Sequence, residues 1–184
     1  MLARAAVRLP HVRFVPGDFA VLDVGQSYDI AVSLEVLAHV FDQGAFLRKI
    51  AASLKPGGYL MLATQNKNAL QRNAIPPPAS GQLRNRVDRH QLRRLLEPDF
   101  EIVRMGSITP RFNRGLLRFI NSKKLTDFAN ALHLSFLPAQ LRSIQERAWL
   151  GWSLMVLARK RDAKKSVDPT WSLQQLTRHP QKDF

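Results

Sequence analysis

Residues able to perform chemistry are few in this chain, and they lie far apart. There is no cysteine, which excludes a disulfide, a thiolate metal site and a cysteine nucleophile. The five histidines are His11, His39, His90, His133 and His179. Their separations lack the short ligand spacing of a metal-binding motif. The sequence therefore predicts no metal site.

Three short motifs remain as candidates for binding. The first is the turn Pro16-Gly17-Asp18-Phe19, and the second is the apolar run of residues 30–34 that leads into Glu35 and His39. The third is Lys55-Pro56-Gly57-Gly58. Because glycine and proline punctuate regular structure, the first and third motifs mark places where an element ends.

The elements around these motifs alternate between strands and helices. Residues 12–15, 30–34 and 59–64 are β-rich or almost wholly apolar, and each run predicts a short strand. Before the last of these, Asp42 is placed to cap a helix whose apolar residues recur at helical spacing as far as Leu54. The order strand, strand, helix, strand is typical of an α/β fold.

The second half of the chain continues this pattern. Residues 65–87, with three consecutive prolines, predict a long polar loop. Asp88 then caps a helix that ends at Pro98, and residues 100–105 alternate as a strand. Two or three amphipathic helices are expected within residues 114–147, followed by a last strand at 150–158. We expect most of the polar remainder, from residue 159 onward, to be mobile.

Composition limits the class of protein. The 184 residues suit one domain with a real core, and 28 Lys+Arg against 14 Asp+Glu give a net charge of +14, which invites a nucleic-acid partner. However, the charge divides into +5 over residues 1–92 and +9 over residues 93–184, so solvated surface is favoured over a nucleic-acid footprint. No apolar run is long enough for a membrane-spanning helix or a signal peptide, and we expect a soluble cytoplasmic protein.

The ordered motifs resemble the later motifs of the class I S-adenosylmethionine-dependent methyltransferases, especially the small-molecule branch that includes quinone-biosynthesis enzymes. The resemblance rests on residues 16–19, on 28–32 leading into 35–40, and on 54–60, and it extends over roughly residues 5–160. It implies a Rossmann-like α/β methyltransferase sheet, S-adenosyl-L-methionine as cofactor and a small-molecule methyl acceptor as partner.

The resemblance also assigns cofactor-binding roles to Asp18, Phe19, Ser33 and Leu34. The Asp18 carboxylate would accept a hydrogen bond from the adenine amino group, and Phe19 would cover the ring edge. Ser33 and Leu34 would flank the methionine portion, outside the carboxyl end of their strand. Taken alone, a Gly-Asp turn favours a plain turn residue at Asp18; within the ordered set we favour adenine contact.

His39 is the candidate catalytic residue. The family often reads Glu-Val-Leu-Glu-His-Val, and Ala38 replaces the second acid here. His39 could remove a proton from an acceptor hydroxyl or amine, or it could cap or pack the start of a helix. Glu35 is expected to be a structural hydrogen-bond partner near the cofactor. Methyl transfer from a sulfonium is a direct displacement, so alignment and exclusion of water can lower most of the barrier.

The family opens with a strand, a glycine-rich GxGxG turn, a helix and a second strand, which this sequence lacks. Its nine glycines contain no such turn, and residues 1–9 resemble the tail of that helix. We therefore expect an N-terminally truncated sheet that retains strands 3 to 7 of the family order 3-2-1-4-5-7-6. Residues 12–15 would then lack a neighbour, and residues 30–34 would become an exposed apolar edge open to self-association.

The expected organisation is a partial methyltransferase domain over residues 1–160 and a flexible tail over 161–184. A helical insertion at about 111–148 would precede the last strand; it could line an acceptor pocket or contact a membrane surface, although core packing is favoured. Two functions are left open. One is methyl transfer to a small molecule, and the other is a non-catalytic basic module that binds RNA or a protein partner.

Overall fold

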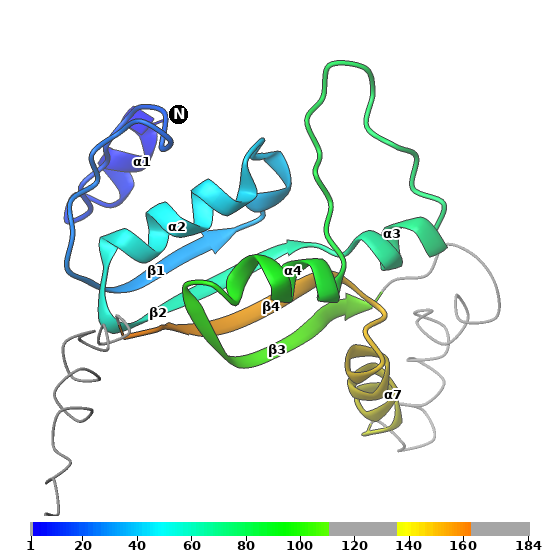
Figure 1. Ribbon diagram of the computed structural model, residues 1–184. Helices are drawn as coiled ribbons and strands as arrows, with labels where there is room; N and C mark the ends of the chain where they lie inside the picture. Colours follow the sequence, from blue (N-terminus) through cyan, green and yellow to red (C-terminus); the bar gives the residue numbers. More distant parts are fainter. Residues whose placement is uncertain (1, 111–135, 163–184) are drawn as a thin grey trace, which may run out of the picture.

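Four strands form one mixed sheet at the centre of the molecule (Figure 1). The computed structural model describes residues 2–110 and 136–162, and its strands are β1 (Tyr28–Leu34), β2 (Leu54–Gln65), β3 (Phe100–Pro110) and β4 (Gly151–Lys160). Their order across the sheet is β1-β2-β4-β3. β1 runs parallel to β2, whereas β4 is antiparallel to both of its neighbours. β1 and β3 are therefore the edges of this sheet.

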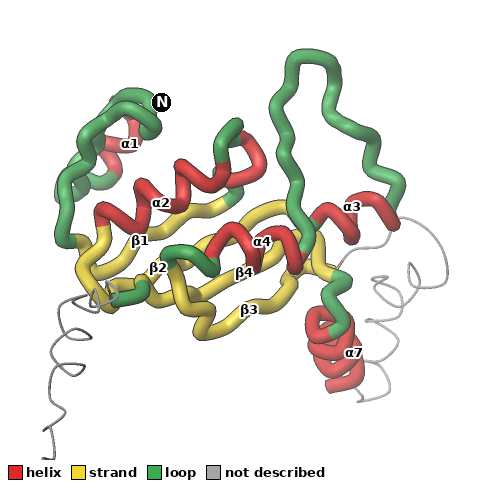
Figure 2. Tube along the Cα trace, in the orientation of Figure 1, coloured by secondary structure: helices red, strands yellow, loops and turns green. Residues whose placement is uncertain are grey.

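Two helices cover one face of the sheet. The helices of the described residues are α1 (Leu2–Arg8), the 3-10 helix η1 (Leu37–His39), α2 (Gln43–Ser53), α3 (Lys67–Arg72), α4 (Arg89–Leu96) and α7 (Phe136–Arg147). Figure 2 shows α2 and α4 on the same side of the strands. Their apolar side chains meet those of β2 and β4 in one core, which includes Leu47, Leu62, Leu92, Leu96, Leu154 and Val156.

The opposite face of the sheet is open over β1 and β2. The register places Val32 beside Met61 and Met61 beside Leu157, so these three side chains share that face. Val32 is 60% exposed and Met61 is 41% exposed, although both are apolar. The prediction that residues 30–34 form an exposed apolar edge is confirmed.

Two helices begin at the residues that the sequence predicts. Asp42 accepts a hydrogen bond from the Ala45 amide at 2.8 Å and begins α2. Asp88 begins α4 with a capping box: its carboxylate accepts from the Gln91 amide at 2.9 Å, and its own amide donates to Gln91 Oε1 at 3.0 Å. These caps fix where α2 and α4 start over the sheet.

Three details of the prediction are wrong. Residues 12–15 form no strand, because no described strand lies beside them and an extended segment gains ladder hydrogen bonds only from a neighbour. The α/β methyltransferase fold class is confirmed, but the described strands correspond to the family's strands 4 to 7 and not to strands 3 to 7. In addition, the predicted loop 65–87 contains the short helix α3.

Several predictions fall outside the described residues. The helices expected within 114–135 and the tail from residue 163 lie there, and α7 is the part of the expected insertion that is described. Residues 1–9 include helix α1, as expected.

Within residues 2–110 and 136–162, no helix is both long enough and apolar enough to cross a membrane.

Candidate functional site

A groove of about 1000 Å³ lies beside β1, and we call it the β1 groove. Its walls come from β1, from α2 and from the irregular segment of residues 13–25. Two of the predicted cofactor-binding residues, Phe19 and Ser33, line it together with Tyr28 and Phe46. The groove therefore brings together residues of the first two sequence motifs.

Phe19 is held against α2. Its ring packs edge-on against Phe46 with the ring centres 5.2 Å apart. The Lys49 amine lies 5.4 Å from the centre of the Phe19 ring and donates a hydrogen bond to the Ala20 carbonyl at 2.9 Å. These contacts attach the turn of residues 16–20 to α2 and fix Phe19 in the wall of the groove.

Asp18 shapes the turn that carries Phe19. Its Oδ1 atom accepts a hydrogen bond from the Ala20 amide at 2.9 Å, and its carbonyl accepts from the Leu22 amide at 2.9 Å. Gly17 precedes it with φ +148°, a conformation that favours glycine. Asp18 is exposed and is not among the residues that line the groove.

Ser33 supplies a buried hydroxyl to the β1 groove. Its side chain is on the α2 side of the strand, and the residue is only 5% exposed. Within the part of the chain that the structure describes, its Oγ atom has no hydrogen-bond partner. A buried hydroxyl without a partner is costly, and a polar group of a bound molecule would remove that cost.

Leu34 and His39 lie near the groove without lining it. Leu34 is 57% exposed at the carboxyl end of β1, on the open face. His39 ends η1, where its amide donates to the Val36 carbonyl at 2.8 Å, and its side chain is exposed. The structure therefore places both at the end of β1 and outside the cavity itself.

Glu35 connects the ends of three strands. It has φ +59°, an uncommon conformation for a residue with a side chain, and its amide donates to the Ala63 carbonyl at 2.8 Å. Its Oε1 atom accepts a hydrogen bond from the Ser153 hydroxyl, also at 2.8 Å. This agrees with the structural role expected for Glu35. Ser153 was not a candidate, because it is 118 residues away and only the pairing of β2 with β4 brings it near.

The β1 groove is large enough to hold a small organic molecule. Its volume lies at the upper end of the usual range for small-molecule sites, and its lining is mostly apolar with a few polar groups. Among the residues described, no group of three or more His, Asp or Glu side chains could hold a metal ion. The donors and acceptors of this site suit an organic ligand bound alongside β1.

Comparisons with known proteins agree with this fold. A family profile described as a methyltransferase domain matches residues 6–103, more than half of the chain. A ubiquinone biosynthesis O-methyltransferase of Bradyrhizobium sp. (strain ORS 278) is 47% identical over 47 residues, which are 26% of this chain and 19% of that protein. The chain thus spans about a fifth of the curated relative that it matches.

Two solved structures share the fold at low identity. An S-adenosylmethionine-dependent methyltransferase from Mesorhizobium loti has a TM-score of 0.57 and 20% identity, with 86% of this chain and 75% of that chain covered. The second is the 1,6-didemethyltoxoflavin-N1-methyltransferase of Burkholderia thailandensis, solved with 1,6-didemethyltoxoflavin and S-adenosylhomocysteine. It has a TM-score of 0.52 and 19% identity, with 88% of this chain and 56% of that chain covered. These likenesses give no support to the alternative of a basic binding module. The chain belongs to the methyltransferase-domain family whose profile matches residues 6–103.

Proposed function

We propose that the chain binds S-adenosylmethionine in the β1 groove and transfers its methyl group to an oxygen atom of a small-molecule acceptor. The cofactor is that of the family, and the oxygen is suggested by the ubiquinone biosynthesis O-methyltransferases among its relatives. The observation that carries the proposal is Ser33, a buried hydroxyl without a described partner in a groove large enough for the cofactor.

Two residues that line the β1 groove and two that lie beside it would contact the cofactor. Phe19, fixed against Phe46, would cover the adenine ring. Asp18 uses Oδ1 within its turn, which leaves Oδ2 to accept from the adenine amino group. The Ser33 hydroxyl would bond the amino-acid end, and Leu34 would flank it. When bound, the cofactor supplies a methyl group on a positively charged sulfur, which an acceptor oxygen can displace directly.

His39 is our candidate on the acceptor side. Its imidazole is exposed just beyond the carboxyl end of β1 and forms no hydrogen bond within the described ranges. It is therefore available to take a proton from an acceptor hydroxyl. We expect His39→Gln to lower kcat by about 100-fold while the affinity for S-adenosylhomocysteine stays the same. An unchanged kcat would remove His39 from the chemistry.

Calorimetry with S-adenosylhomocysteine tests the proposed cofactor site. We expect saturable heat from the purified chain, and binding about tenfold weaker or worse in Ser33→Ala. Because the Ser33 hydroxyl has no described partner to lose, this variant should be no less stable to heat than the parent. Ser80→Ala, at an exposed loop position, is the matched control and should bind normally. No heat from the chain, or equal affinity in both variants, would refute the proposal.

We also propose that copies of the chain associate through the outer edge of β1. Because the Glu35 amide points toward β2, the amides and carbonyls of Ile30, Val32 and Leu34 point away from it. No described strand pairs with these groups, and Ile30 is 62% exposed. A flat apolar edge of this kind favours pairing with another strand.

A further inference from the structure

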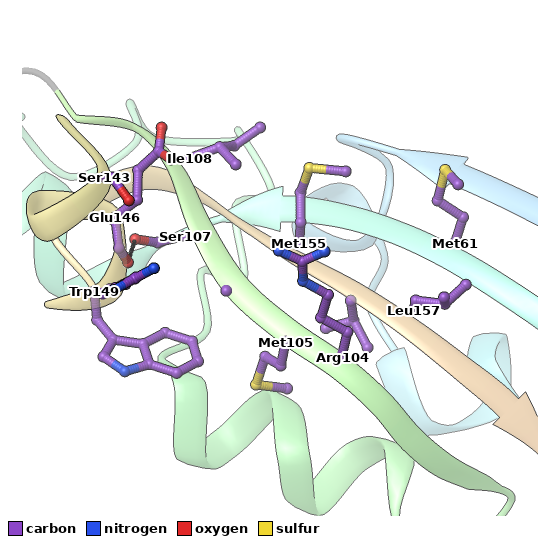
Figure 3. Close-up of a pocket in the computed structure, with 13 residues that line it drawn as sticks. Met61, Arg104, Met105, Ser107, Ile108, Ser143, Glu146, Trp149, Met155 and Leu157 are labelled. Carbon is purple, nitrogen blue, oxygen red and sulfur yellow. Dashed lines mark hydrogen bonds between the residues drawn. The ribbon is translucent and has the colours of Figure 1, made fainter. Parts of the chain in front are cut away.

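A second cavity lies at the other edge of the sheet, between α7 and strands β3 and β4 (Figure 3). It measures about 650 Å³, and we call it the α7 groove. Met61, Met155 and Leu157 reach it from neighbouring strands, on the sheet face opposite α2 and α4. None of the residues that line the α7 groove lines the β1 groove.

The floor of the α7 groove is apolar and open at Gly106. Among the described residues other than its two chain neighbours, no atom lies within 4 Å of the position that a Cβ atom at Gly106 would occupy. Gly106 is paired with Met155 across the β3–β4 ladder, so the open space lies beside a methionine side chain. Methionine is flexible and polarizable and adapts to apolar ligands of different shapes. This floor suits an apolar chain or ring.

Positive charge lines the same groove. Arg104 of β3 and Arg147 of α7 both line it and are exposed, and neither forms an ion pair or hydrogen bond with any described residue. Glu146 also lines the groove, but Arg142 Nε lies 3.2 Å from its Oε1 atom and compensates its charge. The two arginines are therefore free to bind an anion.

The wall between α7 and the sheet is held by Ser107. Its hydroxyl donates to the Glu146 carbonyl at 2.8 Å and accepts from the Gly151 amide at 3.0 Å. Ser107 is 3% exposed, so these hydrogen bonds are shielded from water. The carboxyl end of α7 is thus fixed against β3 and β4, and the groove is formed before any ligand arrives.

We propose that the α7 groove binds an amphipathic anion, a molecule with an apolar chain or ring and one carboxylate or phosphate group. The apolar part would lie over Gly106 and the methionines, and the anion would accept hydrogen bonds from Arg104 and Arg147. Both stretches of this chain outside the described residues carry a net positive charge, which does not complement the two arginines. Residues 111–135 hold five Lys+Arg and one Asp, and residues 163–184 hold four Lys+Arg and two Asp. The proposal is independent of methyl transfer.

Equilibrium dialysis with dodecanoate and with dodecyl phosphate, each below its micelle concentration, tests this site. We expect saturable binding with one molecule per chain. Two variants should weaken it about tenfold or more: the double variant Arg104→Gln with Arg147→Gln, which removes the charges, and Gly106→Val, which fills the open space. Arg93→Gln and Val103→Ile, at exposed positions outside the groove, are the matched controls and should bind as the parent does. Circular dichroism and thermal unfolding show that each variant is folded.

Each probe separates one part of the proposal from the rest. Dodecanol and inorganic phosphate should bind about tenfold more weakly than dodecyl phosphate, because each lacks one half of the ligand. Equal binding of either would overturn the proposal, and so would variants that bind like the parent. Vesicles of anionic lipid distinguish a membrane headgroup from a free molecule: binding to vesicles without binding of the monomeric probes would also contradict a site for single molecules.

Discussion

The two faces of the sheet carry similar side chains in very different surroundings. On the face covered by α2 and α4, Leu60 and Leu62 of β2 are fully buried. On the opposite face, Tyr59 is 40% exposed and Met61 is 41% exposed, although each is a direct neighbour of one of those leucines along the strand. Because side chains alternate along a strand, each strand contributes equally to both faces. The difference in burial between the two faces therefore comes from the helices that cover one of them.

This difference separates stability from binding. The covered face contains the buried core, so it supplies most of the free energy of folding. The open face carries the α7 groove, and the outer edge of β1 carries the β1 groove and the proposed contact with a second copy. Both regions leave apolar groups in contact with water. A substitution in the covered core should therefore affect stability, whereas one on the open face or at the edge of β1 should affect binding or association.

The largest expected contrast is between adjacent residues of β2. Leu62→Ala leaves a cavity in the covered core and should lower the free energy of unfolding by about 2–5 kcal/mol. Met61→Ala, one residue away on the open face, should lower it by only about 1 kcal/mol or less. Chemical denaturation of both variants measures the two values. Equal losses would show that the open face is covered in solution.

A smaller effect on stability is expected at the start of α4, one of the two helices that cover the sheet. Asp88→Ala removes the capping box and should cost about 1 kcal/mol, whereas Asp88→Asn keeps a capping side chain and should cost less. The Gln91 amide, and with it the His90 amide, holds the pKa of the Asp88 carboxyl below its usual value.

The lowered pKa of Asp88 also gives a pH dependence. The charged carboxylate stabilises the fold above the unfolded pKa of about 4, and this contribution is lost as the pH falls through the lower pKa of the folded state. The parent should therefore lose stability more steeply than Asp88→Asn below about pH 4. Unfolding curves measured from neutral to acidic pH compare the two, and parallel pH profiles would mean that Asp88 does not contribute.

The smallest effect on stability is expected on the open face at the edge of β1. Val32→Lys should change the free energy of unfolding by about 0.5 kcal/mol or less, because Val32 is 60% exposed. It should nevertheless reduce self-association, since a charged residue opposes edge-to-edge pairing. Light scattering over a range of concentrations measures the mass of parent and variant. A parent that stays monomeric, or a variant that associates equally well, would contradict the proposed edge contact.

Local signals allowed much of this fold to be predicted. The caps at Asp42 and Asp88 gave the helix starts, and the apolar runs gave the strands at 30–34 and 59–64. Residues 12–15 have a composition suited to a strand, but they form none because no strand of the described residues lies beside them. Pairing with a neighbour is a property of the whole sheet and leaves no local signal.

The candidate site was only partly predictable. Phe19 and Ser33 were found through the family resemblance, and both line the β1 groove, but their roles toward a cofactor stay predictions. The contact of Glu35 with Ser153 and the α7 groove depend on strand register between distant segments. No short motif encodes that register, so sequence reasoning missed both features.

The most direct measurement of the central claim is a nuclear magnetic resonance titration of the isotope-labelled chain with S-adenosylhomocysteine. Amide signals of residues lining the β1 groove, Phe19, Ser33 and Phe46 among them, should shift and saturate with the ligand, while those of Gly106 and Met155 in the α7 groove stay unchanged. Shifts confined to the α7 groove, or no shifts at all, would show that the β1 groove does not bind this nucleoside.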